Sequence, residues 1–222
     1  MIHPFEICMT SRQRVSALVT AMAGMTESAV DQTIQALLEG NISLAHDVLQ
    51  KENAIKHMEL HLETAVLECL SHRGLLGDEL RSMACVLTIN KDLGRMGQLA
   101  TETARKVIEL RENLQGPARF DLQPMAIAVS HVCRKALRAV VRQDPVLAES
   151  ALHSEETVRK YGNYVYHCIH KRLVTGDSET NSDPALLLAS RSLEQIAERA
   201  TCLANNLISW RRNKARHARL AG

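Results

Sequence analysis

Two glutamates four residues apart, Glu194 and Glu198, are the side chains in this sequence best placed to do chemistry. They lie in the segment SLEQIAERA, whose apolar residues recur at helical spacing, so both carboxylates project from one face of a helix. Like charges at this spacing repel by roughly 0.2–0.5 kcal/mol in an isolated helix. A bound cation would remove that repulsion and use the carboxylate oxygens as ligands. The alternative is a solvated acidic face, paired with Arg191, Arg199 or Arg159.

Two histidine pairs offer a second pattern for metal binding. His57 and His61 are four residues apart, and His167 and His170 are three apart. Neither pair has the HExxH arrangement that adds a catalytic glutamate, and no ExxH pattern of the di-iron bundles occurs. The sequence also contains no glycine-rich phosphate loop and no nucleophile with a recognisable base. We therefore interpret the histidines as surface residues and the chain as non-enzymatic.

The composition is that of a globular helical protein. The chain has 222 residues, 45% of them hydrophobic and 23% charged, which is enough material for a sizeable core. Aromatic residues make up only 3%, which favours helices rich in alanine and leucine over strands. The formal net charge of +2 and the single tryptophan argue against binding nucleic acid.

The cysteines and the apolar runs indicate a cellular location. The six cysteines are scattered, and none forms a CxxC pair, which is typical of thiols in a reducing compartment. The first residues lack the long apolar region of a signal peptide, and no apolar run approaches the roughly 20 residues that span a bilayer. We therefore expect a cytoplasmic protein.

Apolar residues recur at three- and four-residue steps through most of the chain, which predicts an all-α fold of six long helices. Gly40-Asn41 supplies a stop and a new start, Gly74 supplies the next stop, and Asp78 is placed to cap the third helix. Gln115-Gly116-Pro117 breaks the chain near its middle. Asp-Pro pairs then open the fifth and sixth helices, because proline is tolerated at the first helical position. The six segments cover about residues 15–37, 44–69, 80–107, 121–142, 145–171 and 183–212.

The two halves of the chain resemble each other. In the second helix of each half, Glu52 matches Glu155, which lies 103 residues later. In the third helix, Leu93 matches Leu193, which lies 100 residues later. Agreement in order, length and acidic positions predicts two tandem three-helix bundles. Their expected extents are residues 10–114 and 120–213, followed by a basic tail, 214–222, that we expect to be frayed and solvated.

The third-helix segments resemble the PhoU family, in which each of two three-helix repeats carries a leucine followed by ERIGD in its third helix. The second copy here reads RSLEQIAERATCLANNL, residues 191–207, and the first reads NKDLGRMGQLATETA, residues 90–104. Leu80-Arg81 matches the leucine-arginine at the start of this helix in the family. The resemblance covers about residues 10–213 and implies the two-bundle fold.

The resemblance also implies metal clusters held by acidic motifs on neighbouring helices. In the second repeat, the implied ligands of a divalent or iron-type cation are Glu194 and Glu198. Glu155, which matches an aspartate in the family's second helix, is a third. In the first repeat, glycine and glutamine stand where two acids are expected, so we predict a weakened or absent site there. The positions concerned are Gly94, Gln98 and the remaining acid, Glu52.

The function that the resemblance implies is negative regulation of phosphate signalling and uptake. Such a regulator couples a phosphate ABC transporter to a sensor histidine kinase, forms a homodimer and meets the membrane only through its partners. Partner binding is expected on the third helices, near Arg81 and Glu194. Two alternatives remain open: a divergent scaffold that has lost metal and regulates a different partner, and a metal-dependent enzyme that uses the carboxylates or histidines.

Overall fold

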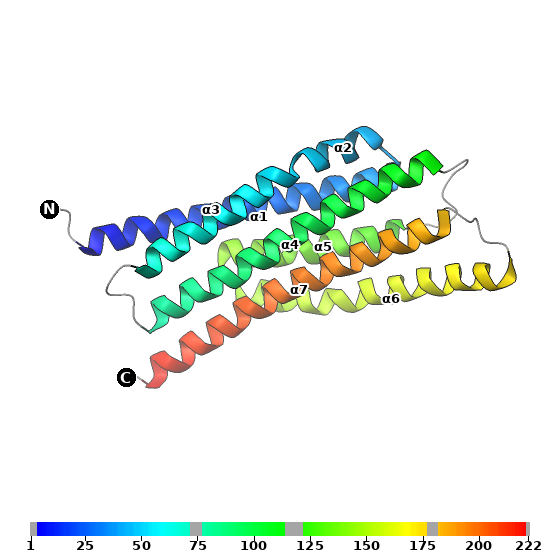
Figure 1. Ribbon diagram of the computed structural model, residues 1–222. Coiled ribbons are helices and arrows are strands. Elements are labelled where there is room, and N and C mark those ends of the chain that lie inside the picture. Colours follow the sequence, from blue (N-terminus) through cyan, green and yellow to red (C-terminus); the bar gives the residue numbers. More distant parts are fainter. Residues whose placement is uncertain (1–3, 72–76, 114–121, 177–181, 221–222) are drawn as a thin grey trace.

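The structure is a computed structural model that describes residues 4–71, 77–113, 122–176 and 182–220 (Figure 1). Within these ranges the chain forms helices and no strand, which confirms the all-α prediction. No helix of the described ranges combines the length and the hydropathy that crossing a membrane requires. The helices are α1 (Pro4–Glu39), α2 (Ile42–Gln50), α3 (Glu52–Ser71), α4 (Asp78–Asn113), α5 (Gln123–Arg142), α6 (Pro145–Thr175) and α7 (Ser182–Leu220).

The second predicted helix, residues 44–69, is divided into α2 and α3 at Lys51. The Lys51 amide donates to the carbonyl of Val48 at 3.1 Å, one residue closer in sequence than the partner in an α-helix. The Lys51 ammonium reaches α1, where it lies 2.9 Å from the Ser28 hydroxyl and 2.5 Å from the Gln32 side-chain oxygen. Neither glycine nor proline marks this position. The division therefore rests on contacts with α1, which the hydrophobic pattern cannot reveal.

The two halves turn at matching places. Gly40 and Gln143, 103 residues apart, both adopt left-handed backbone angles, with φ of 61° and 53°, at the ends of α1 and α5. Asn41 and Asp144 follow, and their side-chain oxygens accept hydrogen bonds from amides in the first turns of α2 and α6. Glutamine adopts this conformation less readily than glycine. In the second half, Arg211 donates two hydrogen bonds to the Gln143 carbonyl, at 2.7 and 3.1 Å, which supports the turn.

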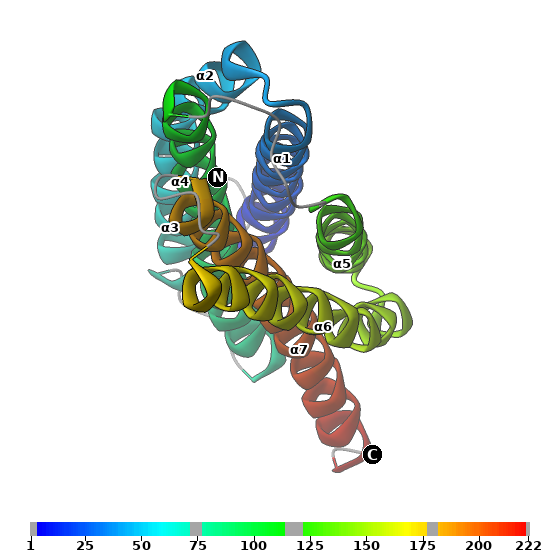
Figure 2. The same cartoon turned by 90° about the vertical axis from the view of Figure 1, so that its right-hand side faces the viewer.

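Burial repeats with the same spacing. From Met22 to Ala36, the residues buried along α1 have buried counterparts on α5, 103 positions later. Examples are Met22 and Met125, Ala23 and Ala126, and Ile34 and Leu137. The chain therefore forms two three-helix bundles, α1–α4 and α5–α7, in which α2 and α3 together serve as one helix. Buried residues of both bundles join in one continuous hydrophobic core, and Figure 2 shows the bundles packed side by side.

Helices α4 and α7, the third helix of each bundle, run in opposite directions and pack against each other (Figure 1). At one end of this seam the Lys106 ammonium donates to the Ser192 hydroxyl at 2.6 Å. At the other end the Asn206 amide donates to the Asp92 carboxylate at 3.0 Å. Lys106 and Asn206 are 100 residues apart, as are Asp92 and Ser192, so the two contacts occupy equivalent positions. The bundles are thus related by an approximate two-fold symmetry.

The last two helices are longer than the sequence pattern predicts. α6 continues to Thr175 and ends at Gly176, whose φ is 77°. α7 continues to Leu220, so the basic tail that we expected to be frayed is helical to that residue. Alanine and arginine are good helix formers, and neither glycine nor proline interrupts the tail before Gly222. The predicted breaks at Gly74 and Gln115-Gly116-Pro117 lie outside the described residues.

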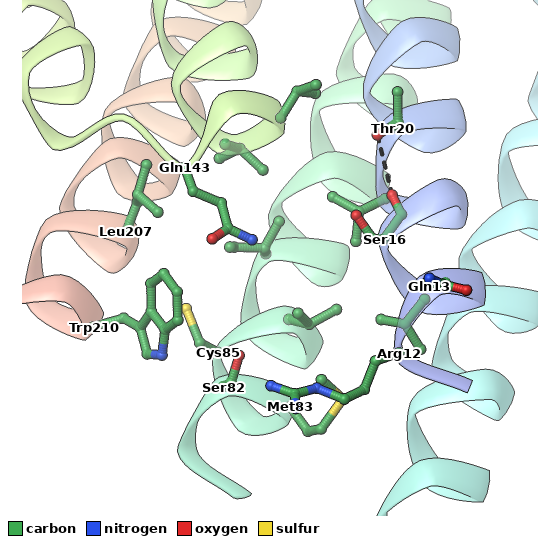
Figure 3. Close-up of a pocket in the computed structure, with 16 residues that line it drawn as sticks. Arg12, Gln13, Ser16, Thr20, Ser82, Met83, Cys85, Gln143, Leu207 and Trp210 are labelled. Carbon is green, nitrogen blue, oxygen red and sulfur yellow. Dashed lines mark hydrogen bonds between the residues drawn. The ribbon is translucent and has the colours of Figure 1, made fainter. Parts of the chain in front are cut away.

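A cavity of about 290 Å³ lies where the two bundles meet (Figure 3). Helices α1 and α4 of the first bundle line it, together with the C-terminal parts of α5 and α7 from the second. Gln143, Leu207 and Trp210 border the cavity on one side, and Gln13 and Ser16 border it on the other. Its walls therefore mix apolar side chains with neutral polar ones.

Candidate functional site

The acidic motif of the second repeat lies in the seam between α6 and α7. The side chain of Glu194 on α7 is only 17% exposed, and its carboxylate lies directly over Gly162 of α6. A Cβ atom added to Gly162 would overlap with this carboxylate. Arg191, one turn before Glu194, donates to the carboxylate at 2.7 Å. Glycine at position 162 thus gives the carboxylate room to enter the seam.

The first repeat has the same arrangement with the two helices exchanged. In the seam between α3 and α4, the glutamate is Glu59 on α3, and its carboxylate lies over Gly94 of α4. A Cβ atom at Gly94 would overlap with Glu59. Gly94 therefore does more than mark a lost acid: it leaves room for a carboxylate that the facing helix supplies.

The repeat offsets show that these four residues are counterparts. Glu59 and Gly162 are 103 residues apart, the offset of the second helices. Gly94 and Glu194 are 100 residues apart, the offset of the third helices. Each seam thus holds one glutamate over one glycine, and the glutamate has changed helix between the repeats. The sequence prediction missed Glu59, although applying the 103-residue offset to Gly162 identifies it.

Burial gives the Glu59 carboxyl an unusual electrostatic environment. Removal from water raises the pKa of Glu59 above its ordinary value, the charge of Glu63 raises it further, and Lys91 partly opposes both effects. The Asn90 side-chain amide donates to the main-chain carbonyl of Glu59 at 2.8 Å, which ties α4 to α3 at this point. The seam of the first repeat therefore holds a carboxylate with a weakened preference for the charged form.

The remaining ligands predicted for the second repeat lie near Cys202. Burial is the main reason that the pKa of the Cys202 thiol is raised, and the charges of Asp92, Glu155 and Glu198 add to the effect while Arg199 opposes it. The part of the chain that the structure describes contains no group of three or more His, Cys, Asp or Glu side chains placed to hold a metal ion. Glu155, Glu194 and Glu198 are therefore not arranged to share a cation in the structure, so the predicted metal site has no geometric support.

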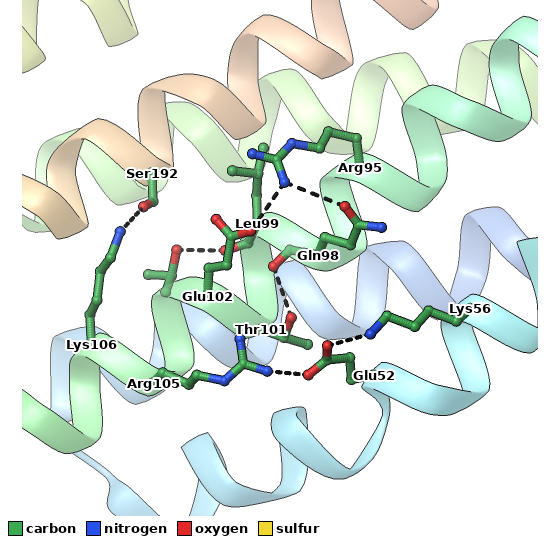
Figure 4. A network of polar contacts seen from close by, with 11 residues as sticks. Glu52, Lys56, Arg95, Gln98, Leu99, Thr101, Glu102, Arg105, Lys106 and Ser192 are labelled. Atoms are coloured by element: carbon green, nitrogen blue, oxygen red, sulfur yellow. Dashed lines mark hydrogen bonds and ion pairs between the residues drawn. The ribbon is translucent and has the colours of Figure 1, made fainter.

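The acid expected to remain in the first repeat, Glu52, is balanced by cations of the chain itself (Figure 4). The Lys56 ammonium donates to one of its carboxylate oxygens at 2.7 Å, and the guanidinium of Arg105, from α4, donates to the other. These contacts, the Lys56 hydrogen bond first among them, lower the pKa of Glu52. Two ion pairs from two helices thus occupy the carboxylate that the sequence offered as a metal ligand.

Gln98, the second altered position of the first motif, also faces a resident cation. The Arg95 guanidinium donates to the Gln98 side-chain oxygen at 3.4 Å and to Glu102 at 3.1 Å (Figure 4). In the second repeat, Arg191 contacts the other motif position, Glu194. In each repeat, an arginine of the third helix therefore contacts one residue of the motif.

Arg81, the residue predicted to contact a partner, is exposed at the start of α4. Its guanidinium lies 3.4 Å from the Asp78 carboxylate, one turn earlier, and Leu80 beside it is 49% exposed. Arg81 also lines a shallow hollow with Cys85 and Trp210. An accessible cation beside an exposed leucine suits a contact surface, and partner binding there stays a prediction.

The two histidine pairs lie on the surface, as predicted. All four rings are exposed, and His61 lies 3.1 Å from the Arg14 guanidinium. Cys69, Cys85, Cys133, Cys168 and Cys202 form no disulfide bond in the part of the chain that the structure describes.

Sequence comparison connects this geometry with known proteins. Residues 19–107 match the family model of the PhoU domain. The phosphate-specific transport system accessory protein PhoU homolog of Zymomonas mobilis is 27% identical over 188 residues, which cover 85% of this chain and 79% of that protein. The protein of the same name from Pseudomonas putida is 29% identical over 196 residues, which cover 85% of this chain and 74% of that protein. The likeness therefore extends well beyond the matched domain.

Solved structures share the fold. The crystal structure of PhoU from Pseudomonas aeruginosa superposes with a TM-score of 0.86 at 24% identity, over 91% of this chain and 98% of that one. The phosphate transport system regulatory protein PhoU from Streptococcus pneumoniae gives a TM-score of 0.80 at 17% identity, over 90% and 94% of the two chains. Both matches confirm the two-bundle architecture.

Proposed function

We propose that this chain, a divergent member of the PhoU family, is a non-enzymatic accessory regulator of phosphate transport. The observation that carries the proposal is the likeness, over 85% of the chain, to proteins named as accessory to phosphate-specific transport. In its finer form, the chain lowers phosphate signalling and uptake by coupling a phosphate ABC transporter to a sensor histidine kinase.

The shape of the molecule is compatible with a role in binding other proteins. Long helices with large exposed apolar residues offer surfaces for partner contact. On α6 these residues include Tyr164 and Val174, which are 63% and 74% exposed. We place the transporter or kinase contact on the third helices, at Arg81 and around Glu194, and expect the protein to act as a homodimer in the cytoplasm.

The decisive experiment deletes the gene in its own organism and measures phosphate-starvation transcripts in phosphate-rich medium. The proposal expects these transcripts to rise and to return to the starting level when the wild-type gene is restored. A parallel strain that carries Arg81→Glu tests the contact surface, with Arg14→Glu as an exposed control on α1. Transcripts that do not respond to the deletion would overturn the phosphate role.

A second candidate function is a helical scaffold that has lost metal and serves a different partner. The observation that favours it is the resident cations at the motif positions: Lys56 and Arg105 on Glu52, and Arg191 on Glu194. Affinity capture from the wild-type organism separates the two candidates. Recovery of phosphate-transporter subunits supports the first candidate, and consistent recovery of an unrelated complex without them supports the second.

A further inference from the structure

The approximate two-fold symmetry relates the cavity between the two bundles to an equivalent place at the other end of the molecule, and the two places differ in side-chain size. Five valines line the cavity, and three of them, Val19 on α1, Val86 on α4 and Val140 on α5, have counterparts in one hydrophobic cluster elsewhere in the molecule. The repeat offsets assign a leucine to each, namely Leu122, Leu186 and Leu37. These leucines belong to one hydrophobic cluster at the other end of the molecule.

The smaller valine side chains leave additional space beside these three positions. Each valine is one methylene smaller than its leucine counterpart, while the backbone frame around both places is the same. Other lining positions reverse this order, since Ile89, Cys85 and Leu207 have the smaller counterparts Ala189, Ala185 and Val107. The exchange of leucine for valine therefore adds space only beside the three valines. Protein interiors contain few voids larger than a water molecule, and an apolar void of roughly 150 Å³ suffices to bind benzene. A cavity of about 290 Å³ is therefore large enough for a ligand.

The polar groups around the cavity indicate the kind of ligand. Gln13, Ser16, Ser82 and Gln143 offer neutral amide and hydroxyl groups. The charged residue that lines the cavity, Arg12, gives its guanidinium to Glu79 at 2.7 Å, so no net charge from this pair faces a ligand. The Cys85 thiol in the wall stays protonated, because burial raises its pKa to about 11. The lining thus suits an apolar body with an uncharged hydrogen-bonding group.

We propose that this cavity is a binding site for an uncharged small molecule with an apolar body and a hydroxyl or amide group. Because residues of both bundles line it, an occupant contacts both and favours the arrangement in which they are packed together. The site goes beyond the proposed regulatory function and does not depend on it.

The chain carries its own reporter for the test, since Trp210 is its only tryptophan and lines the cavity. The full-length protein is titrated with 1-octanol while Trp210 fluorescence is recorded, and octanoate serves as the charged counterpart. We expect a saturable fluorescence change with octanol, a raised melting temperature, and an affinity for octanoate at least roughly tenfold weaker. A change that does not saturate, or equal affinity for octanoate, would overturn the proposal.

The repeat itself supplies the variant that fills the site. Val19→Leu/Val86→Leu/Val140→Leu gives the cavity the leucines of the opposite end, and it should abolish the octanol response while circular dichroism shows an intact helical fold. Val86→Leu alone, which should weaken octanol binding by roughly tenfold, keeps the test available if the triple variant does not fold. Leu186→Val is the matched control at the opposite end, where the response should stay at the wild-type level. A triple variant that folds and responds like the wild type places the binding elsewhere and refutes the proposal.

Discussion

In each repeat, one glutamate lies over one glycine where the second and third helices meet, but the two residues are exchanged between the helices. In the α3–α4 seam the second helix supplies the carboxylate, Glu59, and the third supplies the glycine, Gly94. In the α6–α7 seam the second helix supplies the glycine, Gly162, and the third supplies the carboxylate, Glu194. What the two repeats share is therefore the pair and its place between the helices. A motif read along one helix misses this, since half of each pair lies on the facing helix.

The first turns of the third helices differ between the repeats in a buried charge. A substitution there should have the largest effect on the free energy of unfolding. Asp183 of α7 is fully buried, and its carboxylate lies 3.0 Å from the Arg172 guanidinium at the end of α6. Its counterpart in the first repeat is Met83. Asp183→Asn leaves the arginine beside a neutral group, and breaking a buried ion pair in this way costs about 3–5 kcal/mol of unfolding free energy. Urea denaturation followed by circular dichroism measures the loss.

The matched control for that variant is Asp78→Asn at the start of α4. Its pair with Arg81 is exposed on both sides, and such pairs are worth at most about 1 kcal/mol. Equal losses in the two variants would contradict the importance of burial at the α6–α7 turn.

Exchanging the residues of one seam tests the reciprocal arrangement directly. Gly162→Glu places a second carboxylate where Glu194 already lies, and we expect a loss of about 1–3 kcal/mol from overpacking. Adding Glu194→Gly gives this seam the arrangement of the first repeat, with the glutamate on the second helix and the glycine on the third. Most of the lost unfolding free energy should therefore be recovered. Urea denaturation of both single variants and the double variant gives the coupling, which we expect to reach about 1 kcal/mol or more.

The mirror exchange, Glu59→Gly with Gly94→Glu, is the control in the first repeat. It should show coupling of the same sign, because Glu59 lies over Gly94 in the same way. Strictly additive losses in both seams would mean that the glutamate and glycine do not depend on each other.

The fold and the seams contain features that the sequence predicts and others that it does not. The helical period, the cap residues Asn41 and Asp144, and the two repeat offsets were sufficient to predict the all-α two-bundle fold. The pattern did not predict the division at Lys51, because a contact with α1 decides it. The single-helix motif likewise presented Gly94 as a loss, because the compensating Glu59 becomes visible only when facing helices are compared.

Two glutamates on α3 should respond to pH in opposite ways. The pKa of Glu59 is raised by burial, so its folded state holds a proton more strongly than the unfolded chain, and its contribution favours folding at low pH and is lost as pH rises above the ordinary value of 4.5. The pKa of Glu52 is lowered by Lys56 and Arg105, so its contribution is present above 4.5 and is lost as pH falls.

Unfolding free energies measured between pH 3 and 7 for Glu59→Gln and Glu52→Gln check this contrast. Relative to wild type, Glu59→Gln should become more stable as pH rises, and Glu52→Gln should become less stable. In each variant, the slope of unfolding free energy against pH should change by an amount that corresponds to about a fraction of one proton. Slopes of the same sign in both variants would refute the difference between the buried and the ion-paired carboxylate.

We expect the smallest difference between the two repeats in their metal content. Arg191 meets Glu194 in the second repeat, and Lys56 and Arg105 meet Glu52 in the first, so these two carboxylates already have cations of the chain itself. We therefore expect protein purified without chelator and its Glu194→Ala/Glu198→Ala variant to carry the same trace metal by elemental analysis. Stoichiometric metal that disappears in the variant would instead show that Glu194 leaves Arg191 to join Glu198 and Glu155 around a cation. The repeats would then differ in function as well as in the assignment of residues, because in the first repeat Gln98 provides no carboxylate and Lys56 and Arg105 hold Glu52.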